Sequence, residues 1–183
     1  MLMTSYCDYC NSHLEDAFNK NYHDTQYGFP LTDDNLLFER LILEINQAGL
    51  SWITILKKAG NFHKAYRGFD IKKVAKFSEK DRARLLADAG IIRNKLKVNA
   101  AIFNAQKILE LQKEFGSFKS WLDAHHPLPK DAWTKLFKET FVFTGGEIVN
   151  EFLMSTGYLQ GAHQKNCPVY KKVASLRPAW MKK

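Results

Sequence analysis

The sequence predicts an all-α protein, and two observations lead to that prediction. Apolar residues recur at spacings of three and four in several long stretches, which is typical of amphipathic helices. No stretch alternates apolar and polar residues for long enough to build a sheet. The length of 183 residues fits one domain, so we expect a single globular unit over residues 1–183.

The clearest predicted helix covers residues about 34–48. Thr32, Asp33 and Asp34 are plausible N-cap residues in front of it, and Gly49 is a plausible C-cap. On a helical wheel Glu44 borders the apolar face of this helix. The apolar positions of that face are Leu37, Phe38, Leu41, Ile42, Ile45 and Ala48.

Six more stretches have helical patterns. A second helix is expected to restart near Ser51 and to run through Leu56. The segment HHPLP at 125–129 should be a connector, because Pro127 and Pro129 prevent a helix from continuing. The last residues, SLRPAWMKK, are expected to form a loosely held tail. The remaining helices are expected over 79–88, 94–114, 117–124, 131–139 and 146–156.

Composition and charge limit the possible partners and the compartment. The net charge of +8 suits a polyanion such as DNA, although many cytosolic proteins are modestly basic, so charge alone leaves both interpretations open. No apolar run approaches the length of about 20 residues that a membrane span needs. The N-terminus lacks a secretory pattern, and three cysteines are too few for a disulfide framework. We therefore expect a cytoplasmic protein.

The segment DAGIIRNKLKVNAAIFNA at 88–105 contains a possible phosphate clamp. Two helices meet there at a short turn, where Gly90 is favoured if φ is positive. The helix that starts near Asn94 has free backbone N–H groups that can receive a phosphate. This pattern fits a helix-hairpin-helix, but it also fits an ordinary hairpin with a solvated basic face. The basic residues around the start are Arg93, Lys95 and Lys97.

Cysteines and histidines near both ends of the chain could bind a metal. His163 and Cys167 are separated by three residues, which places both side chains on one face of a helix or turn. Together with Cys10 and His23 they would complete a closed, structural tetrahedral site. Cys7 lies in a C-x2-C pair with Cys10 and is a rival ligand. Simple packing of these side chains is the alternative.

A third set of residues combines aromatic rings with one carboxylate. It consists of Tyr22, Tyr27, Glu44 and Trp52, and the last two belong to the stretch LEINQAGLSWITIL at 43–56. Rings that stack and a carboxylate that accepts hydrogen bonds suit a flat, nitrogen-rich ligand such as a flipped nucleobase. Core aromatics beside a surface glutamate are the more ordinary interpretation.

Four motifs together resemble the 3-methyladenine DNA glycosylase I family. They occur in the family's order and span nearly the whole chain, and QAGLSW followed by GIIRNKxK is a specific combination. The motifs are YHDTQYGFP at 22–30, LEINQAGLSWITILKK at 43–58, DAGIIRNKLKVNAAIFNA at 88–105 and GAHQKNC at 161–167.

The resemblance implies a helix-hairpin-helix glycosylase fold and a base-excision repair activity. Members hydrolyse the N-glycosidic bond of 3-methyladenine in alkylated double-stranded DNA and leave an abasic site. The hairpin region would cover about 81–110, and a structural zinc would join the terminal segments at about 7–30 and 158–170. We expect a monomer that releases free 3-methyladenine. The ligands implied by the resemblance are Cys10, His23, His163 and Cys167, because Cys7 lies three residues too far from His23.

The resemblance also implies roles for the aromatic and acidic residues. Tyr22, Glu44 and Trp52 match the family's base pocket, and we add Tyr27 to that set. The family lacks the catalytic aspartate of its superfamily, so Glu44 is our candidate for the catalytic group. Leu50, in the short connection that would face DNA, could fill the gap left by a flipped base.

Three departures from the family pattern concern the pocket. The family's Cys-x-Trp reads Cys10-Asn11-Ser12, so an aromatic wall is missing or supplied from elsewhere, and Glu-Trp-Gly reads Gln26-Tyr27-Gly28. Glu147 and Glu151 are unexpected in FVFTGGEIVNEF at 141–152, where we interpret Glu147 as a helix N-terminal residue and not as a base. The alternative function is a zinc-containing protein that binds DNA or alkylated bases without cleavage. A lyase is disfavoured because it needs an amine nucleophile and none of the residues matched to the pocket is a lysine.

Overall fold

The structure is a computed structural model that describes residues 5–182. Within that range the chain forms eleven α-helices and two short 3-10 helices, and no strand occurs there. The predicted all-α class is therefore confirmed. The elements are α1 Tyr6–Ser12, α2 Ala17–Thr25, α3 Asp34–Gln47, α4 Trp52–Ala65, η1 Arg67–Phe69, α5 Ile71–Val74, α6 Glu79–Ala87, α7 Lys95–Phe115, α8 Phe118–His125, α9 Lys130–Thr140, α10 Gly146–Ser155, α11 Pro168–Ser175 and η2 Ala179–Met181.

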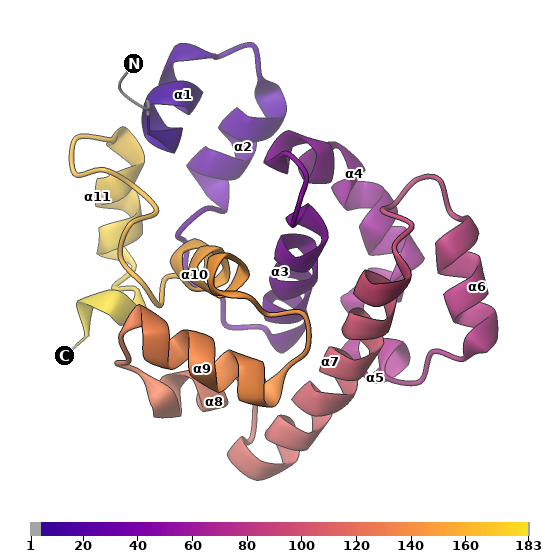
Figure 1. Ribbon diagram of the computed structural model, residues 1–183. Helices are drawn as coiled ribbons and strands as arrows, with labels where there is room; N and C mark the ends of the chain where they lie inside the picture. The colour runs from indigo at the N-terminus through magenta and orange to yellow at the C-terminus, as the bar shows by residue number, and fades with distance from the viewer. Residues whose placement is uncertain (1–4, 183) are drawn as a thin grey trace.

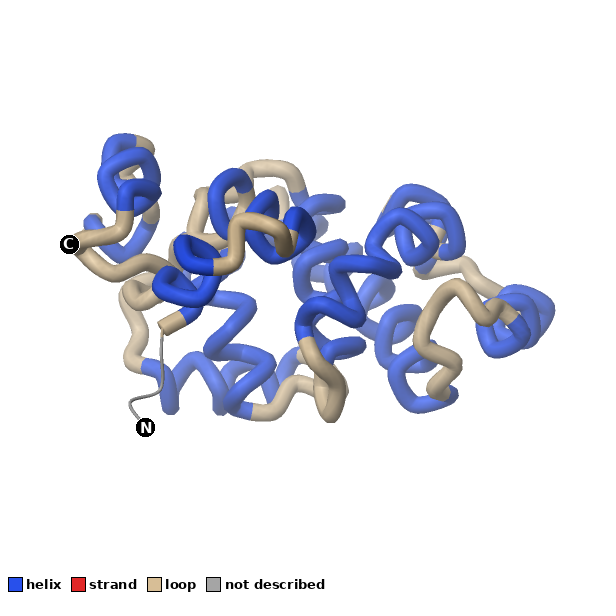
Figure 2. Tube along the Cα trace, turned by 90° about the horizontal axis from the view of Figure 1, so that it is seen from above, coloured by secondary structure: helices blue, strands red, loops and turns tan. Residues whose placement is uncertain are grey.

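Helix α3 lies at the centre of the molecule (Figure 1). It packs against α4, α7, α8 and α10, and its apolar face, with Leu37, Leu41 and Ile45, is fully buried. Figures 1 and 2 show α6 at one extreme of the molecule and both chain ends at the other. The central helix therefore separates the hairpin formed by α6 and α7 from the region where the two ends of the chain meet.

The strongly periodic helices lie where the sequence predicts them, with boundaries within one residue. HHPLP connects α8 and α9 as expected. Helix α4 continues to Ala65, well beyond the predicted end at Leu56, because Ile55 and Phe62 maintain a buried face along it. The sequence patterns miss α1, α2, α5 and α11, which are short. Side-chain caps start the first three, such as the capping box between Ser5 and Asp8, and α11 starts with Pro168.

Two consecutive aspartates perform different capping roles. The Asp33 side chain accepts a hydrogen bond from the Leu36 backbone N–H and caps α3 as expected. The Asp34 carboxylate instead accepts hydrogen bonds from the backbone N–H groups of Phe118, at 2.7 Å, and Lys119, at 3.0 Å. Asp34 therefore ties the start of α3 to the start of α8, a long-range contact that the sequence pattern does not reveal.

The expectation of a loosely held C-terminal tail is wrong. Pro178 is buried against Gly157, and the Trp180 backbone N–H donates to the Gly157 carbonyl at 3.2 Å. Residues Ala179–Met181 form η2. Individual contacts hold this segment in place, and the sequence does not reveal them because they produce no periodic apolar pattern. Among residues 5–182, no helix has both the length and the apolar character that a membrane crossing requires.

Candidate functional site

The break between α3 and α4 has the geometry that its glycine requires. Gly49 has a φ of 81°, which is favourable for glycine and costly for other residues. The Leu50 backbone N–H donates to the Gln47 carbonyl at 2.7 Å, and the Gln47 amide donates back to the Leu50 carbonyl. This closed turn ends α3 just after Glu44 and starts α4 at Trp52.

The structure brings the four predicted base-pocket residues together. Tyr22, Tyr27, Glu44 and Trp52 line one pocket with a volume of about 220 Å³. The ring centroids of Tyr22 and Trp52 are 5.0 Å apart, and those of Tyr22 and Tyr27 are 5.6 Å apart. Aromatic faces and a carboxylate therefore surround a space of the right size for one base.

A larger hollow of about 700 Å³ also borders Tyr22 and Trp52. Its walls come from α2, α3 and α4 and include Arg40 and Glu39, but Glu44 does not line it. The aromatic walls and the Glu44 carboxylate meet only in the smaller of these two pockets.

Burial determines the ionisation of Glu44. The residue is 4% exposed, and its carboxylate has no hydrogen-bond partner among the residues that the structure describes. Burial raises the pKa of Glu44 to about 8; the positive charge of Arg40 opposes that shift, and the negative charge of Glu151 adds to it. A ligand that donates N–H groups or carries positive charge would therefore stabilise the ionised form.

Arg40, which lines the larger hollow beside the pocket, is a charged neighbour of Glu44 that our sequence interpretation missed. It is 6% exposed, donates to the Ser155 carbonyl at 3.3 Å, and lies 4.9 Å from the centroid of the Tyr22 ring. It precedes Glu44 by four residues, so the two side chains share a helix face. That spacing, in an otherwise apolar stretch, is the signal that could have identified it.

Tyr6 and Glu151 also line the pocket and were not assigned there from the sequence. The Tyr6 ring packs edge-on to Tyr27 with centroids 5.4 Å apart, so α1 supplies an aromatic side chain to the pocket. The Glu151 carboxylate accepts a hydrogen bond from the Tyr27 hydroxyl at 3.2 Å. Glu147, in contrast, is 89% exposed in the first turn of α10 and pairs with Lys130, away from the pocket, which fits the predicted local role.

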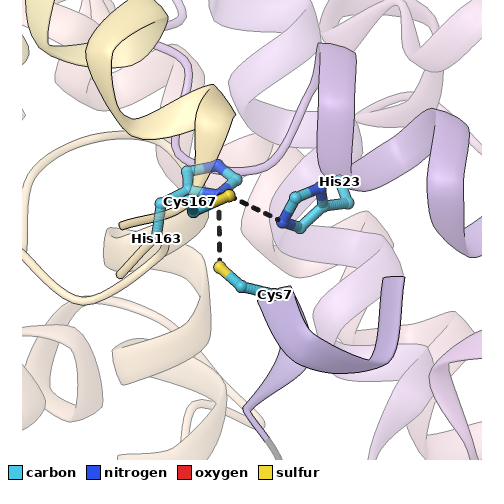
Figure 3. Close-up of side chains that lie close together, drawn as sticks. All are labelled: Cys7, His23, His163 and Cys167. Carbon is cyan, nitrogen blue, oxygen red and sulfur yellow. Dashed lines mark hydrogen bonds between the residues drawn. The ribbon is translucent and has the colours of Figure 1, made fainter. Parts of the chain in front are cut away.

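Four buried side chains from the two ends of the chain form a cluster that could hold a metal ion (Figure 3). One ligand atom from each of Cys7, His23, His163 and Cys167 lies within 4.8 Å of all the others. The second ring nitrogens are already used: Nδ1 of His23 meets the Asp24 carboxylate, and Nε2 of His163 meets the Tyr27 carbonyl, both at 2.7 Å. Such partners orient the remaining ring nitrogens toward a metal.

The structure corrects the expectation that Cys10 belongs to this cluster. Cys10 is buried, but its thiol donates to the Asn19 carbonyl at 3.7 Å. We expected Cys10 because Cys7 lies three residues farther from His23 along the sequence. Because α1 is helical, a helix takes up three residues in about 4.5 Å, so Cys7 reaches His163 and Cys167.

The turn between α6 and α7 is tight for a different reason from the one expected. Gly90 is not among the glycines with positive φ. A Cβ on Gly90 would lie 2.9 Å from Asp88 Oδ1 and 3.1 Å from Asn61 Nδ2, so the turn requires glycine for space. The Gly90 N–H donates to Asp88 Oδ1 at 2.7 Å, and Lys58 donates to the Ala89 carbonyl at 3.0 Å. Asn94 caps α7, as the sequence suggests.

Lys97 does not have the position expected of a phosphate ligand. It is 5% exposed, and its ammonium group donates to the carbonyls of Asn46, at 2.8 Å, and Ala48, at 2.7 Å. The side chain therefore satisfies the C-terminal end of α3 instead of facing solvent. Arg93, Lys95 and Leu50 are exposed and remain available to a partner.

Comparisons with known proteins agree with this geometry. The methyladenine glycosylase family model matches residues 12–133. DNA-3-methyladenine glycosylase 1 of Escherichia coli K12 is 36% identical over 180 residues, covering 88% of this chain and 96% of that protein. The solved 3-methyladenine DNA glycosylase I of Staphylococcus aureus superposes with a TM-score of 0.80 at 33% identity, covering 90% of this chain and 97% of that one.

A second solved structure is informative about the ligand. It is a Tyr-to-Phe variant of 3-methyladenine DNA glycosylase I in complex with 3-methyladenine, with a TM-score of 0.79 and 32% identity, and the match covers 87% of this chain and 96% of that one. The sequence match extends over most of the chain, and the helical architecture is shared. The chain therefore belongs to the methyladenine glycosylase family.

Proposed function

We propose that this chain, a monofunctional DNA-3-methyladenine glycosylase of base-excision repair, holds the excised base in the pocket of Tyr22, Glu44 and Trp52. The observation that carries the proposal is a buried carboxylate without a partner among the described residues, set between aromatic rings in a pocket of about 220 Å³. Such a carboxylate is unfavourable unless a ligand supplies a donor.

The protein contributes to the reaction mainly by selecting the damaged base and positioning it. Methylation at N3 makes the base in DNA cationic, so it is already a good leaving group when the N-glycosidic bond breaks. Tyr22 and Trp52 hold the plane of the base, and the Glu44 carboxylate accepts hydrogen bonds from its edge. Water then attacks the oxocarbenium-like sugar, and an abasic site and free 3-methyladenine result.

Glu44 is our candidate for the group that contributes most to catalysis. In its ionised form it lies beside the position where the cationic base would bind, and it stabilises that charge as the base leaves the stack. Unmodified adenine stays stacked and paired and has a stronger glycosidic bond. Selection therefore arises from the instability of the lesion as well as from the pocket.

We propose that double-stranded DNA binds along the face that carries the α3–α4 turn and the α6–α7 turn. Leu50 is 39% exposed at the first turn and would fill the gap left by the flipped base. Arg93, Lys95 and the backbone N–H groups at the start of α7 would contact phosphates near Gly90. Lys97 keeps the two turns together from inside the protein. We expect the protein to act as a monomer in the cytoplasm.

We propose that the Cys7, His23, His163 and Cys167 cluster holds a structural zinc ion. Two thiolates and two imidazoles are the donor set that zinc prefers, and four protein ligands leave no position for a substrate. The ion would join α1 and α2 to the segment before α11, so its binding would contribute to folding.

The decisive experiment is incubation of the protein with methylated double-stranded DNA, followed by chromatography of the released bases. We expect 3-methyladenine from the wild type and greatly reduced release from Glu44→Gln. A protein that binds methylated DNA but releases no base would support the alternative, a zinc-containing binding protein without cleavage.

A further inference from the structure

We propose that Glu151 is a specificity-determining residue of the base pocket: a second carboxylate that favours a positively charged base over a neutral one. The proposal rests on the assignment of the pocket of Tyr22, Glu44 and Trp52 to the base. Glu151 lines that same pocket from α10, whereas Glu44 enters it from α3. Two acidic side chains from different helices therefore face one small cavity.

The Tyr27 hydroxyl orients Glu151 within the pocket. That hydroxyl donates to Glu151 Oε2 at 3.2 Å, and Tyr27 itself is buried among Tyr6 and Tyr22. Glu151 is partly buried, and burial together with the negative charge of Glu147 raises its pKa. The side chain is therefore neither a solvated surface charge nor part of an ion pair among the described residues.

The charge balance of the pocket argues for a cationic ligand. Arg40 is the positive charge that acts on Glu44, and Lys130 is the one that acts on Glu151. Arg40 lies over the Tyr22 ring and donates to the Ser155 carbonyl, and Lys130 pairs with Glu147, so neither forms a salt bridge with a pocket carboxylate among the described residues. A neutral base can satisfy Glu44 with its N–H groups but leaves the Glu151 charge uncompensated. A cationic base interacts favourably with both carboxylates and with the faces of the surrounding aromatic rings.

The preference for a charged base affects the reaction because the charge of the base changes as the N-glycosidic bond breaks. The N3-methylated base is cationic while it is attached to the sugar. When the N-glycosidic bond breaks, the base keeps the bonding electron pair and leaves as neutral 3-methyladenine, and the positive charge passes to the sugar. A pocket that prefers the cation holds the substrate base more strongly than the neutral product. Glu151 would therefore favour entry of alkylated, charged bases and release of the neutral free base.

Two small probes test this preference without DNA. The first is 3-methyladenine at mildly alkaline pH, where the free base is neutral. The second is the 3,9-dimethyladeninium ion, in which a methyl group at N9 replaces the sugar and the positive charge is permanent. The measurement is the dissociation constant of each probe by calorimetry, and the result is the ratio of the two constants.

We expect Glu151→Gln to weaken binding of the cation by about tenfold to a hundredfold, the range expected for loss of one charged partner. Binding of neutral 3-methyladenine by the same sample should change by less than about threefold, which also shows that the variant is folded. Glu151→Asp retains the charge and should keep most of the preference. Tyr27→Phe removes the orienting hydroxyl and should reduce the preference by a smaller factor.

Glu147→Gln is the matched control, because Glu147 belongs to the same helix but is 89% exposed and does not line the pocket. An unchanged ratio in Glu151→Gln, or an equal fall in Glu147→Gln, would overturn the proposal. Failure of the underlying pocket assignment has a different result: Glu44→Gln would then bind neutral 3-methyladenine as the wild type does.

Discussion

Lys97 provides a test of how the pocket is held in place. Its ammonium group donates to the carbonyls of Asn46 and Ala48, and the side chain is 5% exposed. Hydrogen bonds from a charged group contribute about 1.5–3 kcal/mol each, and carbonyls that lose them inside the protein are unfavourable. Allowing for the desolvation that lowers the pKa of Lys97, we expect Lys97→Met to reduce the free energy of unfolding by about 2–4 kcal/mol.

Urea denaturation measures that loss, and Lys95→Met is the matched control. Lys95 is exposed in the first turn of the same helix, so its replacement should change the free energy of unfolding by less than about 0.5 kcal/mol. For the salt dependence of DNA binding the expectation is reversed, because Lys95→Met should change it and Lys97→Met should not. Lys95→Met should reduce the slope of log affinity against log salt by about one unit, because one phosphate contact is lost.

The Lys97 variant should keep the wild-type salt slope at temperatures where it is folded. A stable Lys97→Met protein with a reduced salt slope would refute this reasoning. It would mean that the ammonium group leaves Asn46 and Ala48 and contacts phosphate when DNA binds.

Four other predictions concern the pocket, the metal cluster and Glu147. Glu44→Gln should weaken binding of free 3-methyladenine in calorimetry while affinity for undamaged DNA stays nearly constant. Burial raises the pKa of Glu44 from 4.5 to about 8, so between these pH values the folded protein binds one proton more than the unfolded chain does. The free energy of unfolding of the wild type should therefore fall as pH rises from about 4.5 to 8. Denaturation curves of Glu44→Gln should lack that component of the decrease. Cys7→Ser should lose metal in elemental analysis and unfold at lower temperature, whereas Cys10→Ser should retain metal; the reverse result would restore Cys10 as the ligand. Glu147→Gln should keep most of the base release, and a loss of about a thousandfold would identify a carboxylate-dependent mechanism.

Periodic apolar positions were sufficient to predict the central helices. Helix α3 shows this most clearly, because its fully buried apolar residues recur at helical spacing and Gly49 ends it. Helix α1 begins at a capping box, and α11 buries Val169 and Val173 beside Cys7 and Cys167, so contacts between the two ends of the chain support both helices. The pattern of apolar residues along the sequence does not show such contacts between the ends of the chain.

The pocket residues could be predicted to the extent that they share a motif. Glu44 and Trp52 flank one turn, so their proximity follows from the local sequence. Tyr6 and Glu151 come from opposite ends of the chain and meet only in the folded protein. Lys97 is basic and near a helix start, which is also the pattern of a phosphate ligand, and only its three-dimensional environment shows that it faces α3.

Two separate devices position the two sides of the pocket. On one side, His163 contacts the Tyr27 carbonyl and His23 follows Tyr22 directly, so the metal-capable cluster fixes the backbone that carries both tyrosines. On the other side, Lys97 holds the turn between Glu44 and Trp52. The carboxylate and the indole are therefore tied to the α6–α7 hairpin, which we propose faces DNA, while the tyrosine wall is tied to the joined ends of the chain. Because the base must fit between these two supports, the pocket depends on contacts that lie outside it on both sides.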